Sequence, residues 1–183
     1  KDENGNIIPD RTPKQRKNNT KFTFARYMFA FIRKRFGDLP VWKIAAAQRG
    51  MTDDNLIQST NYKYLDEKGK ILDMEGFQVS LGPLALPLNL RATRDGTLVT
   101  ITWDDLRDEP SAAPTDRMMV GIFYADYRNT FTLEKETGAT RRDGKCEITL
   151  RDDDGEVCIH PFFARADNTA FSEDKAITLP DTE

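Results

Sequence analysis

The chain holds few residues that could carry covalent or acid-base chemistry. Its one histidine, His160, stands just before Pro161 and two residues after Cys158. Residues two apart in a strand point to the same face, so Cys158 and His160 could touch as a nucleophile and its base would. A strand histidine that donates to a backbone carbonyl is the commoner arrangement, and we favour it over Cys-His or Ser-His-Asp catalysis. We therefore predict no catalytic residue and no enzyme.

Metal and cofactor ligands are also scarce. Two cysteines and one histidine cannot supply the four ligands of a structural zinc site, and no Cys-x-x-Cys occurs. The acidic run at 152–156 offers carboxylates to calcium, but its spacing favours a hairpin turn with Asp-Gly at the tip. There is no phosphate loop and no dinucleotide fingerprint. We predict no metal, no cofactor, and buried free thiols at Cys146 and Cys158, with a bridge between them as the alternative.

The first element expected to position side chains is a long helix. Thr12 can cap a helix that begins at Pro13, and Gln15 completes a capping box. Apolar residues then recur at spacings of three and four until Gly37, which predicts an amphipathic helix over residues 13–36. We expect this helix to bury an aromatic seam that consists of Phe22, Ala25, Phe29, Ile32 and Phe36.

Two shorter helices and a strand are predicted next. Residues 44–48 are rich in alanine, and Asp53 can cap a third helix that runs toward Lys68. Residues 77–81 alternate between apolar and polar before a Gly-Pro pair, which predicts one strand and a turn. We therefore expect residues 1–82 to form a helical N-terminal region.

Charge is divided unevenly along the chain. Residues 1–94 hold 17 Lys and Arg against 10 Asp and Glu, whereas residues 95–183 hold 10 against 20. Between residues 11 and 37 there are nine basic residues and no acidic one. This bias suits an acidic protein, a second copy of the chain or nucleic acid, although a solvated helix face shows the same pattern. The predicted interaction surface consists of Lys14, Lys17, Arg26, Arg33, Lys34 and Arg35.

The rest of the chain, residues 83–183, is predicted to be an antiparallel β-sandwich of about seven strands. Short alternating runs separated by turn residues are typical of this class, so the whole chain is predicted to be α+β. Leu86, Leu88 and Leu90 should share one strand face, and Trp103 should lie buried between the two sheets. Further strands are expected at 118–124, 130–133, 146–150, 157–166 and 171–179.

The strand residues resemble a fibronectin type III domain. Residues 87–103, which end at Trp103, look like its first two strands and its core tryptophan. Residues 163–172 are similar to its last two strands. The resemblance implies a fibronectin type III or immunoglobulin-like topology. Cys158 or His160 stands where such domains carry the tyrosine of the tyrosine corner.

The chain from residue 11 to 179 also resembles an uncharacterised bacterial family of unknown function, known chiefly from gut Bacteroidetes. The resemblance implies a helical region ahead of a sandwich, brings no known activity, and implies that a short Gly-rich segment upstream is missing here. Because the chain starts at Lys1 rather than Met, we also expect upstream residues to have been removed; the sequence assigns no compartment. The residues that carry the resemblance are Thr12, Pro13, Gln15, Lys21, Phe22, Val79, Ser80 and Gly82.

Three classes of function fit these patterns. We favour a non-catalytic interaction or assembly protein, with a protein partner or self-association ahead of nucleic acid. The alternatives are a nucleic-acid-associated protein that uses residues 11–35, and a carbohydrate-binding module or enzyme accessory domain. The last would need exposed aromatics, for which Trp42, Tyr124 and Tyr127 are candidates. Apolar runs fall short of the roughly 20 residues of a membrane span, and no small-molecule substrate is indicated.

Overall fold

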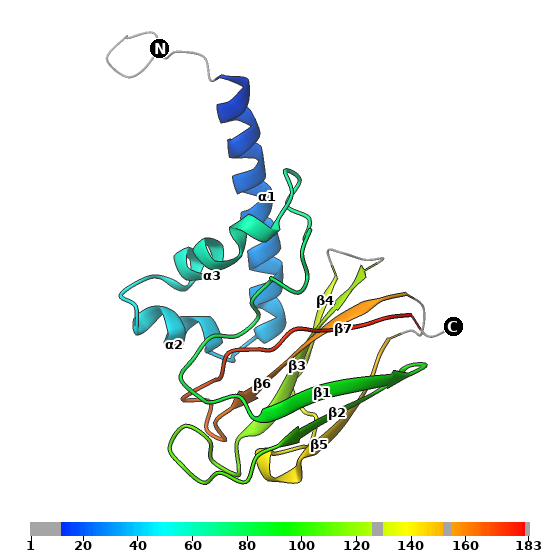
Figure 1. Ribbon diagram of the computed structural model, residues 1–183. Coiled ribbons are helices and arrows are strands. Elements are labelled where there is room, and N and C mark those ends of the chain that lie inside the picture. The colour runs from blue at the N-terminus through cyan, green and yellow to red at the C-terminus, as the bar shows by residue number, and fades with distance from the viewer. Residues whose placement is uncertain (1–11, 126–129, 152–154, 182–183) are drawn as a thin grey trace.

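The structure is a computed structural model that describes residues 12–125, 130–151 and 155–181. Within these residues three α-helices precede seven strands, so the chain is α+β as predicted. Figure 1 shows the helices gathered beside one layer of a two-layered sandwich. The helices are α1 (Pro13–Phe36), α2 (Val41–Ala47) and α3 (Asp53–Asn61), and the strands are β1 (Leu88–Asp95), β2 (Leu98–Asp104), β3 (Arg117–Tyr124), β4 (Phe131–Glu134), β5 (Lys145–Thr149), β6 (Val157–Ala164) and β7 (Ile177–Leu179).

The strands form two antiparallel sheets. One sheet has the order β1-β2-β5 and the other has the order β4-β3-β6-β7. β3 and β6 pair along their whole length, from Arg117 opposite Ala164 to Tyr124 opposite Val157. Three strands facing four in this order make a fibronectin type III-like sandwich. The predicted fold class is confirmed.

The core between the sheets is built around Trp103. This side chain is 4% exposed, and its ring meets the ring of Phe163 edge-on with centroids 5.6 Å apart. Its indole N–H donates to the backbone carbonyl of Arg141 at 2.8 Å, so the polar end of the ring is satisfied as a buried tryptophan requires. The prediction that Trp103 lies between the sheets is confirmed.

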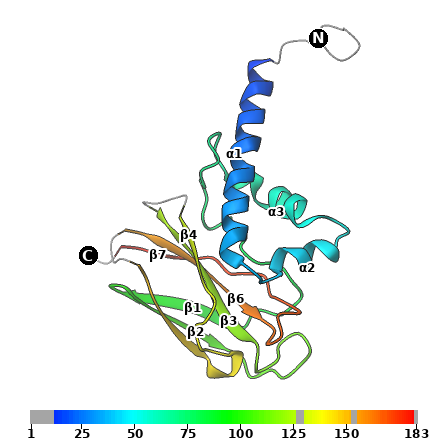
Figure 2. The same ribbon diagram turned by 180° about the vertical axis from the view of Figure 1, so that it is seen from behind.

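A second apolar core lies on the outer face of the β4-β3-β6-β7 sheet, where the helices cover it (Figure 2). The ring of Phe36 in α1 stacks on Phe131 of β4 at 6.0 Å, and Phe77 meets Phe123 of β3 at 5.2 Å. Gly121 of β3 leaves room for the ring of Phe131, because a Cβ at this position would lie 2.9 Å from that ring. Since both faces of the sheet are covered, every residue of β6 is buried.

The long helix begins and ends where the sequence predicts. The backbone N–H of Gln15 donates to the Thr12 hydroxyl, the Gln15 side chain accepts from the Thr12 N–H, and Gly37 ends the helix at φ 58°. The predicted seam is wrong at Phe22, which is 44% exposed because α1 runs on beyond the surfaces that bury its second half. The other members of the seam, Ala25, Phe29, Ile32 and Phe36, are buried.

The predicted strand at 77–81 is wrong, because this segment forms no β-ladder with the described residues. Side chains take the place of a neighbouring strand. The amide of Asn61 donates to the carbonyl of Gln78 at 2.9 Å, and its oxygen accepts from the Gln78 N–H at 2.8 Å. Oδ1 of Asp174 accepts from the backbone N–H groups of Val79 and Ser80 at 2.9 and 2.8 Å. These contacts satisfy the backbone without a β-ladder.

Two further predictions need correction. Leu88 does not share a face with Leu90, because the register shifts between Leu88 and Arg91 and Asn89 adopts φ 52°; Leu88 is consequently 72% exposed. The third helix is capped by the hydroxyl of Thr52 rather than by Asp53 and stops at Asn61, short of the predicted Lys68.

Candidate interaction surface

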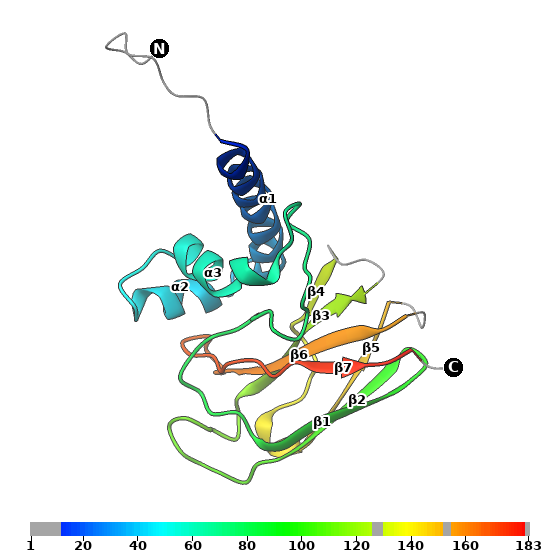
Figure 3. The same ribbon diagram turned by 45° about the horizontal axis from the view of Figure 1, so that its top comes forward.

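The N-terminal half of α1 is the most exposed element of the described chain. Every side chain from Pro13 to Thr20 is exposed, and Ala25 is the first buried residue. Figures 1 and 3 show these first turns standing clear of α2, α3 and the sandwich. The helix contains no acidic residue. Its capping box holds the first turn without tertiary contacts, so this half presents a preformed basic rod to solvent.

The six residues predicted as an interaction surface do not form one patch. The guanidinium of Arg33 pairs with Asp53 and Asp54 of α3 at 3.2 and 2.9 Å, so it joins two helices. Lys17 pairs with Glu67, and the guanidinium of Arg35 lies over the ring of Phe31. Within the described residues, Lys14, Arg26 and Lys34 make no ion pair, and all three are exposed.

Exposed apolar side chains accompany these charges and were not predicted. Phe22, Phe24 and Tyr27 of α1 are 44%, 43% and 69% exposed, and Met51, just before α3, is 40% exposed. The helical spacing assigned Phe22 to the core, so the sequence held no signal that α1 extends past its partners. Exposed apolar residues that gather in one place are typical of binding surfaces.

Phe22 stands between two concave surfaces. The first, here called the α1–α3 groove, has a volume of about 530 Å³. The second runs along α1 past Arg26 and Tyr27 and has a volume of about 540 Å³. A third concavity, here called the lysine hollow, adjoins the groove at Lys63. The groove is lined by Phe22, Met51, Asn55, Gln58, Ser59, Tyr62 and Lys63, and the hollow by Lys21, Lys63, Leu65, Asp66, Glu67, Lys68, Lys70 and Leu72.

Cys158, His160 and Asp174 form a buried chain of polar contacts. Nδ1 of His160 lies 2.7 Å from Oδ2 of Asp174, and its Nε2 lies 3.4 Å from Sγ of Cys158. The predicted contact of Cys158 with His160 is therefore present, whereas the predicted carbonyl partner is wrong because a carboxylate takes its place. The side chains of Cys158, His160 and Asp174 are 0%, 0% and 3% exposed, and the helices cover this face of β6. A substrate therefore cannot reach the three side chains in this structure, although they follow the order of a Cys-His-Asp triad.

The protonation of His160 follows from these contacts. Burial disfavours the charged imidazolium, but the hydrogen bonds to Asp174 and Cys158 outweigh burial and raise the pKa of His160 to about 9. At neutral pH the ring is therefore an imidazolium that donates to the carboxylate. The same carboxylate holds Val79 and Ser80, so the cluster ties the segment after the helices to the last part of the chain.

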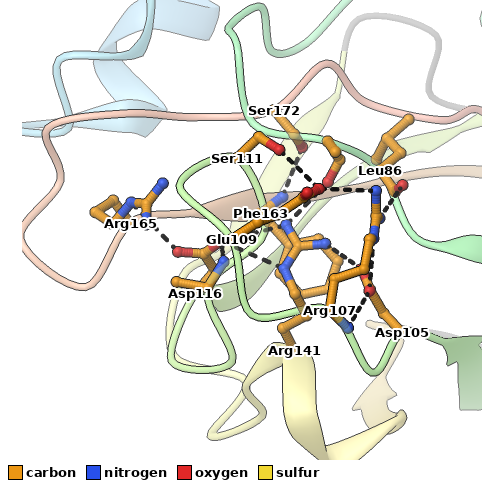
Figure 4. A network of polar contacts seen from close by, with 12 residues as sticks. Leu86, Asp105, Arg107, Glu109, Ser111, Asp116, Arg141, Phe163, Arg165 and Ser172 are labelled. Carbon is orange, nitrogen blue, oxygen red and sulfur yellow. Dashed lines mark hydrogen bonds and ion pairs between the residues drawn. The ribbon is translucent and has the colours of Figure 1, made fainter.

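A second polar cluster surrounds the buried guanidinium of Arg141 (Figure 4). It lies 2.6 Å from Asp105 and 3.3 Å from Asp116, donates to the carbonyl of Ala85, and stacks on the ring of Phe163 at 4.2 Å. Hydrogen bonds from Arg107 and Arg141 outweigh burial and lower the pKa of Asp105 to about 2. The cluster joins the linker before β1, the loop after β2 and the strand β6.

The remaining chemical candidates do not converge on a site. Cys146 points into the core between the sheets and Cys158 into the core under the helices, and both thiols are free. Among the described residues no three His, Cys, Asp or Glu gather as metal ligands, and 152–154 lie outside them. Trp42 and Tyr124, proposed as exposed aromatics, are buried at 3% each, and Tyr127 lies outside the described residues.

Comparisons with known proteins returned solved structures only. No family model matches the chain, and no curated protein matches it. A solved structure described as "Myokine structure" aligns at a TM-score of 0.40 and 18% identity, over 55% of this chain and 99% of that chain. The crystal structure of the chicken CNTN1 FN1-FN3 domains aligns at a TM-score of 0.40 and 6% identity, over 57% of this chain and 34% of that chain. No helix in the described ranges is long and apolar enough to cross a bilayer.

Proposed function

We propose that the protein is a non-catalytic interaction or assembly protein that holds a protein partner on the exposed surface of α1. The observation that carries the proposal is the half-exposed helix, on which Lys14 and Arg26 make no ion pair among the described residues and Phe22 and Tyr27 stay exposed. Basic side chains steer an acidic partner and apolar ones supply affinity on contact. In this proposal residues 1–82 bind and residues 83–183 form the sandwich that supports them.

The buried clusters support a non-catalytic role. His160 and Arg141 are both fully buried and are satisfied by neighbouring side chains and carbonyls. Each joins segments far apart in the chain, which is what a structural group does. Thr12 and Gln15, which form the capping box of α1, are also among the residues that resemble the bacterial family of unknown function. That resemblance suggests no activity for the chain.

Sedimentation of the full chain at low and high salt tests this function. A triple variant, Lys14→Glu, Arg26→Glu and Lys34→Glu, reverses three charges that make no ion pair among the described residues, whereas Arg33 is left unchanged because it pairs with α3. We expect the parent at low salt to form larger species, alone or with acidic proteins, and the variant to stay monomeric. Lys43→Glu on α2 is the control for a charge reversal at an exposed lysine away from α1.

Nucleic acid is the competing partner for the same residues. Its binding would fall steeply with salt, and the triple variant would remove it while sedimentation of the protein alone stays constant. A parent that binds mixed DNA and RNA but associates with no protein would replace the proposed function with this one. A parent that binds neither would leave α1 as a solvated face.

A further inference from the structure

The α1–α3 groove combines three kinds of contact within one small surface. Phe22 and Met51 supply exposed apolar atoms. Asn55 and Gln58, one turn apart on α3, line the same groove, and within the described residues their side chains make no hydrogen bond. Lys63 lines both the groove and the lysine hollow, so an apolar surface leads directly into a cationic one.

The lysine hollow is positive despite its two acidic residues. Oδ1 of Asp66 accepts from the backbone N–H groups of Lys68 and Lys70, and Glu67 pairs with Lys17. The carboxylate of Asp66 is therefore occupied within the loop, and that of Glu67 is occupied by α1. The ammonium groups that line the hollow without an ion pair among the described residues are those of Lys21, Lys63, Lys68 and Lys70. Those of Lys21 and Lys63 also lie over the rings of Tyr62 and Tyr64.

Resting on the proposed function, we propose that the groove and the hollow together bind an acidic peptide segment of a partner protein, with a bulky apolar side chain against Phe22 and Met51 and its carboxylates among the lysines. Amide side chains such as Asn55 and Gln58 match the donors and acceptors of a peptide backbone. Nucleic acid fits less well, because the ammonium of Lys21 already lies 4.5 Å over the ring of Tyr62, where a base would stack.

Fluorescence anisotropy with labelled synthetic peptides tests this assignment on the full chain. The probes are short peptides that pair leucine or phenylalanine with glutamates, a set with serine in place of the apolar residues, and a set with glutamine in place of the glutamates. We expect only the first set to bind tightly. Phe22→Ser and Met51→Ser should each weaken it about tenfold, and Lys63→Glu should weaken it more and reduce its salt dependence.

Two matched variants keep the test specific. Leu106→Ser replaces an apolar side chain that is fully exposed on the sandwich, and Lys43→Glu reverses an exposed charge on α2. Both should bind the first peptide set like the parent. Circular dichroism should show the same melting for all five variants, because Phe22, Met51 and Lys63 contribute exposed side chains.

The outcomes that would contradict the peptide site differ from those that would contradict the proposed function. Equal binding of the serine set would mean that the basic face acts by charge alone, so the groove has no role while α1 still binds protein. If Phe22→Ser changes self-association and no peptide binds, the occupant is a second copy. Single-stranded DNA that binds the parent and loses affinity in Phe22→Ser would overturn both.

Discussion

The two buried polar clusters of the sandwich hold their charge in different ways. In the first cluster, hydrogen bonds from the guanidinium groups of Arg107 and Arg141 lower the pKa of Asp105 to about 2, and a guanidinium does not lose its proton in proteins. The imidazolium of His160 exists only while a proton stays on it, up to about pH 9. The Arg141 cluster should therefore stay intact at alkaline pH, whereas the contact between His160 and Asp174 should weaken when the imidazolium loses its proton.

Replacing Arg141 should produce the largest loss of stability. Arg141→Met leaves the carboxylates of Asp105 and Asp116 buried without their shared partner, and we expect a cost of about 3 to 5 kcal/mol in the free energy of unfolding. Denaturant titration measures it. Arg142→Met, which changes the exposed neighbour, is the control and should cost less than about 0.5 kcal/mol. Similar values for the two variants would show that Arg141 does not hold the cluster.

The His160 cluster should come next. Asp174→Ala removes the acceptor of two backbone N–H groups and the partner of the imidazolium, for an expected cost of about 3 kcal/mol. Glu173→Ala changes the exposed neighbouring carboxylate and should be nearly neutral. Hydrogen exchange should also quicken at Val79 and Ser80 in Asp174→Ala only. Unchanged protection of these two amides in Asp174→Ala would show that Asp174 does not stabilise the segment that contains Val79 and Ser80.

Alkaline pH should separate the two clusters without mutation. The folded pKa of His160, about 9, lies above its unfolded value near 6.5, so its contribution is complete below pH 6.5 and is lost as pH rises through 9. The loss should not exceed about 3 kcal/mol. Denaturant titrations from pH 6 to 10 measure it. His160→Asn should show a flatter profile than the parent over this range, and parallel profiles would contradict the assignment.

The smallest effect concerns the link between the Arg141 cluster and the core. Trp103→Phe keeps an aromatic ring but removes the donor to the Arg141 carbonyl. Trp42→Phe is the control, because Nε1 of Trp42 has no partner within the described chain. We expect Trp103→Phe to cost about 1 kcal/mol more than Trp42→Phe in denaturant titrations. Equal costs would mean that the indole acts through its volume alone.

Local and periodic features of the fold were predictable from the sequence. The capping box at Thr12 and Gln15, the stop at Gly37 and the alternation that leads to Trp103 depend on neighbours a few residues away. Such signals do not require knowledge of the tertiary structure. They were sufficient for three helices followed by an antiparallel sandwich, but they also predicted a strand at 77–81 that the structure lacks.

The candidate surface and the polar clusters could not be predicted in the same way. Phe22 repeats with the helical period of Phe29, and only the position of the sheet leaves it exposed. Asp174 takes the role of a pairing strand for Val79, from 95 residues away. In the sequence, Arg141 cannot be distinguished from a surface arginine, because its partners Asp105 and Asp116 lie 36 and 25 residues away. Each case depends on contacts between segments that no local pattern encodes.

The packing of the helices on the β4-β3-β6-β7 sheet also determines when the protein can finish folding. α1 is synthesised before Phe131 and Phe162, which pack under it and follow it by some hundred residues, and Asp174 is made later still. Until then the aromatic residues of α1 have no sheet to cover them. A chain that lacks Asp174 also lacks the acceptor for the backbone of Val79 and Ser80, so packing of the helical region waits for synthesis of the sandwich.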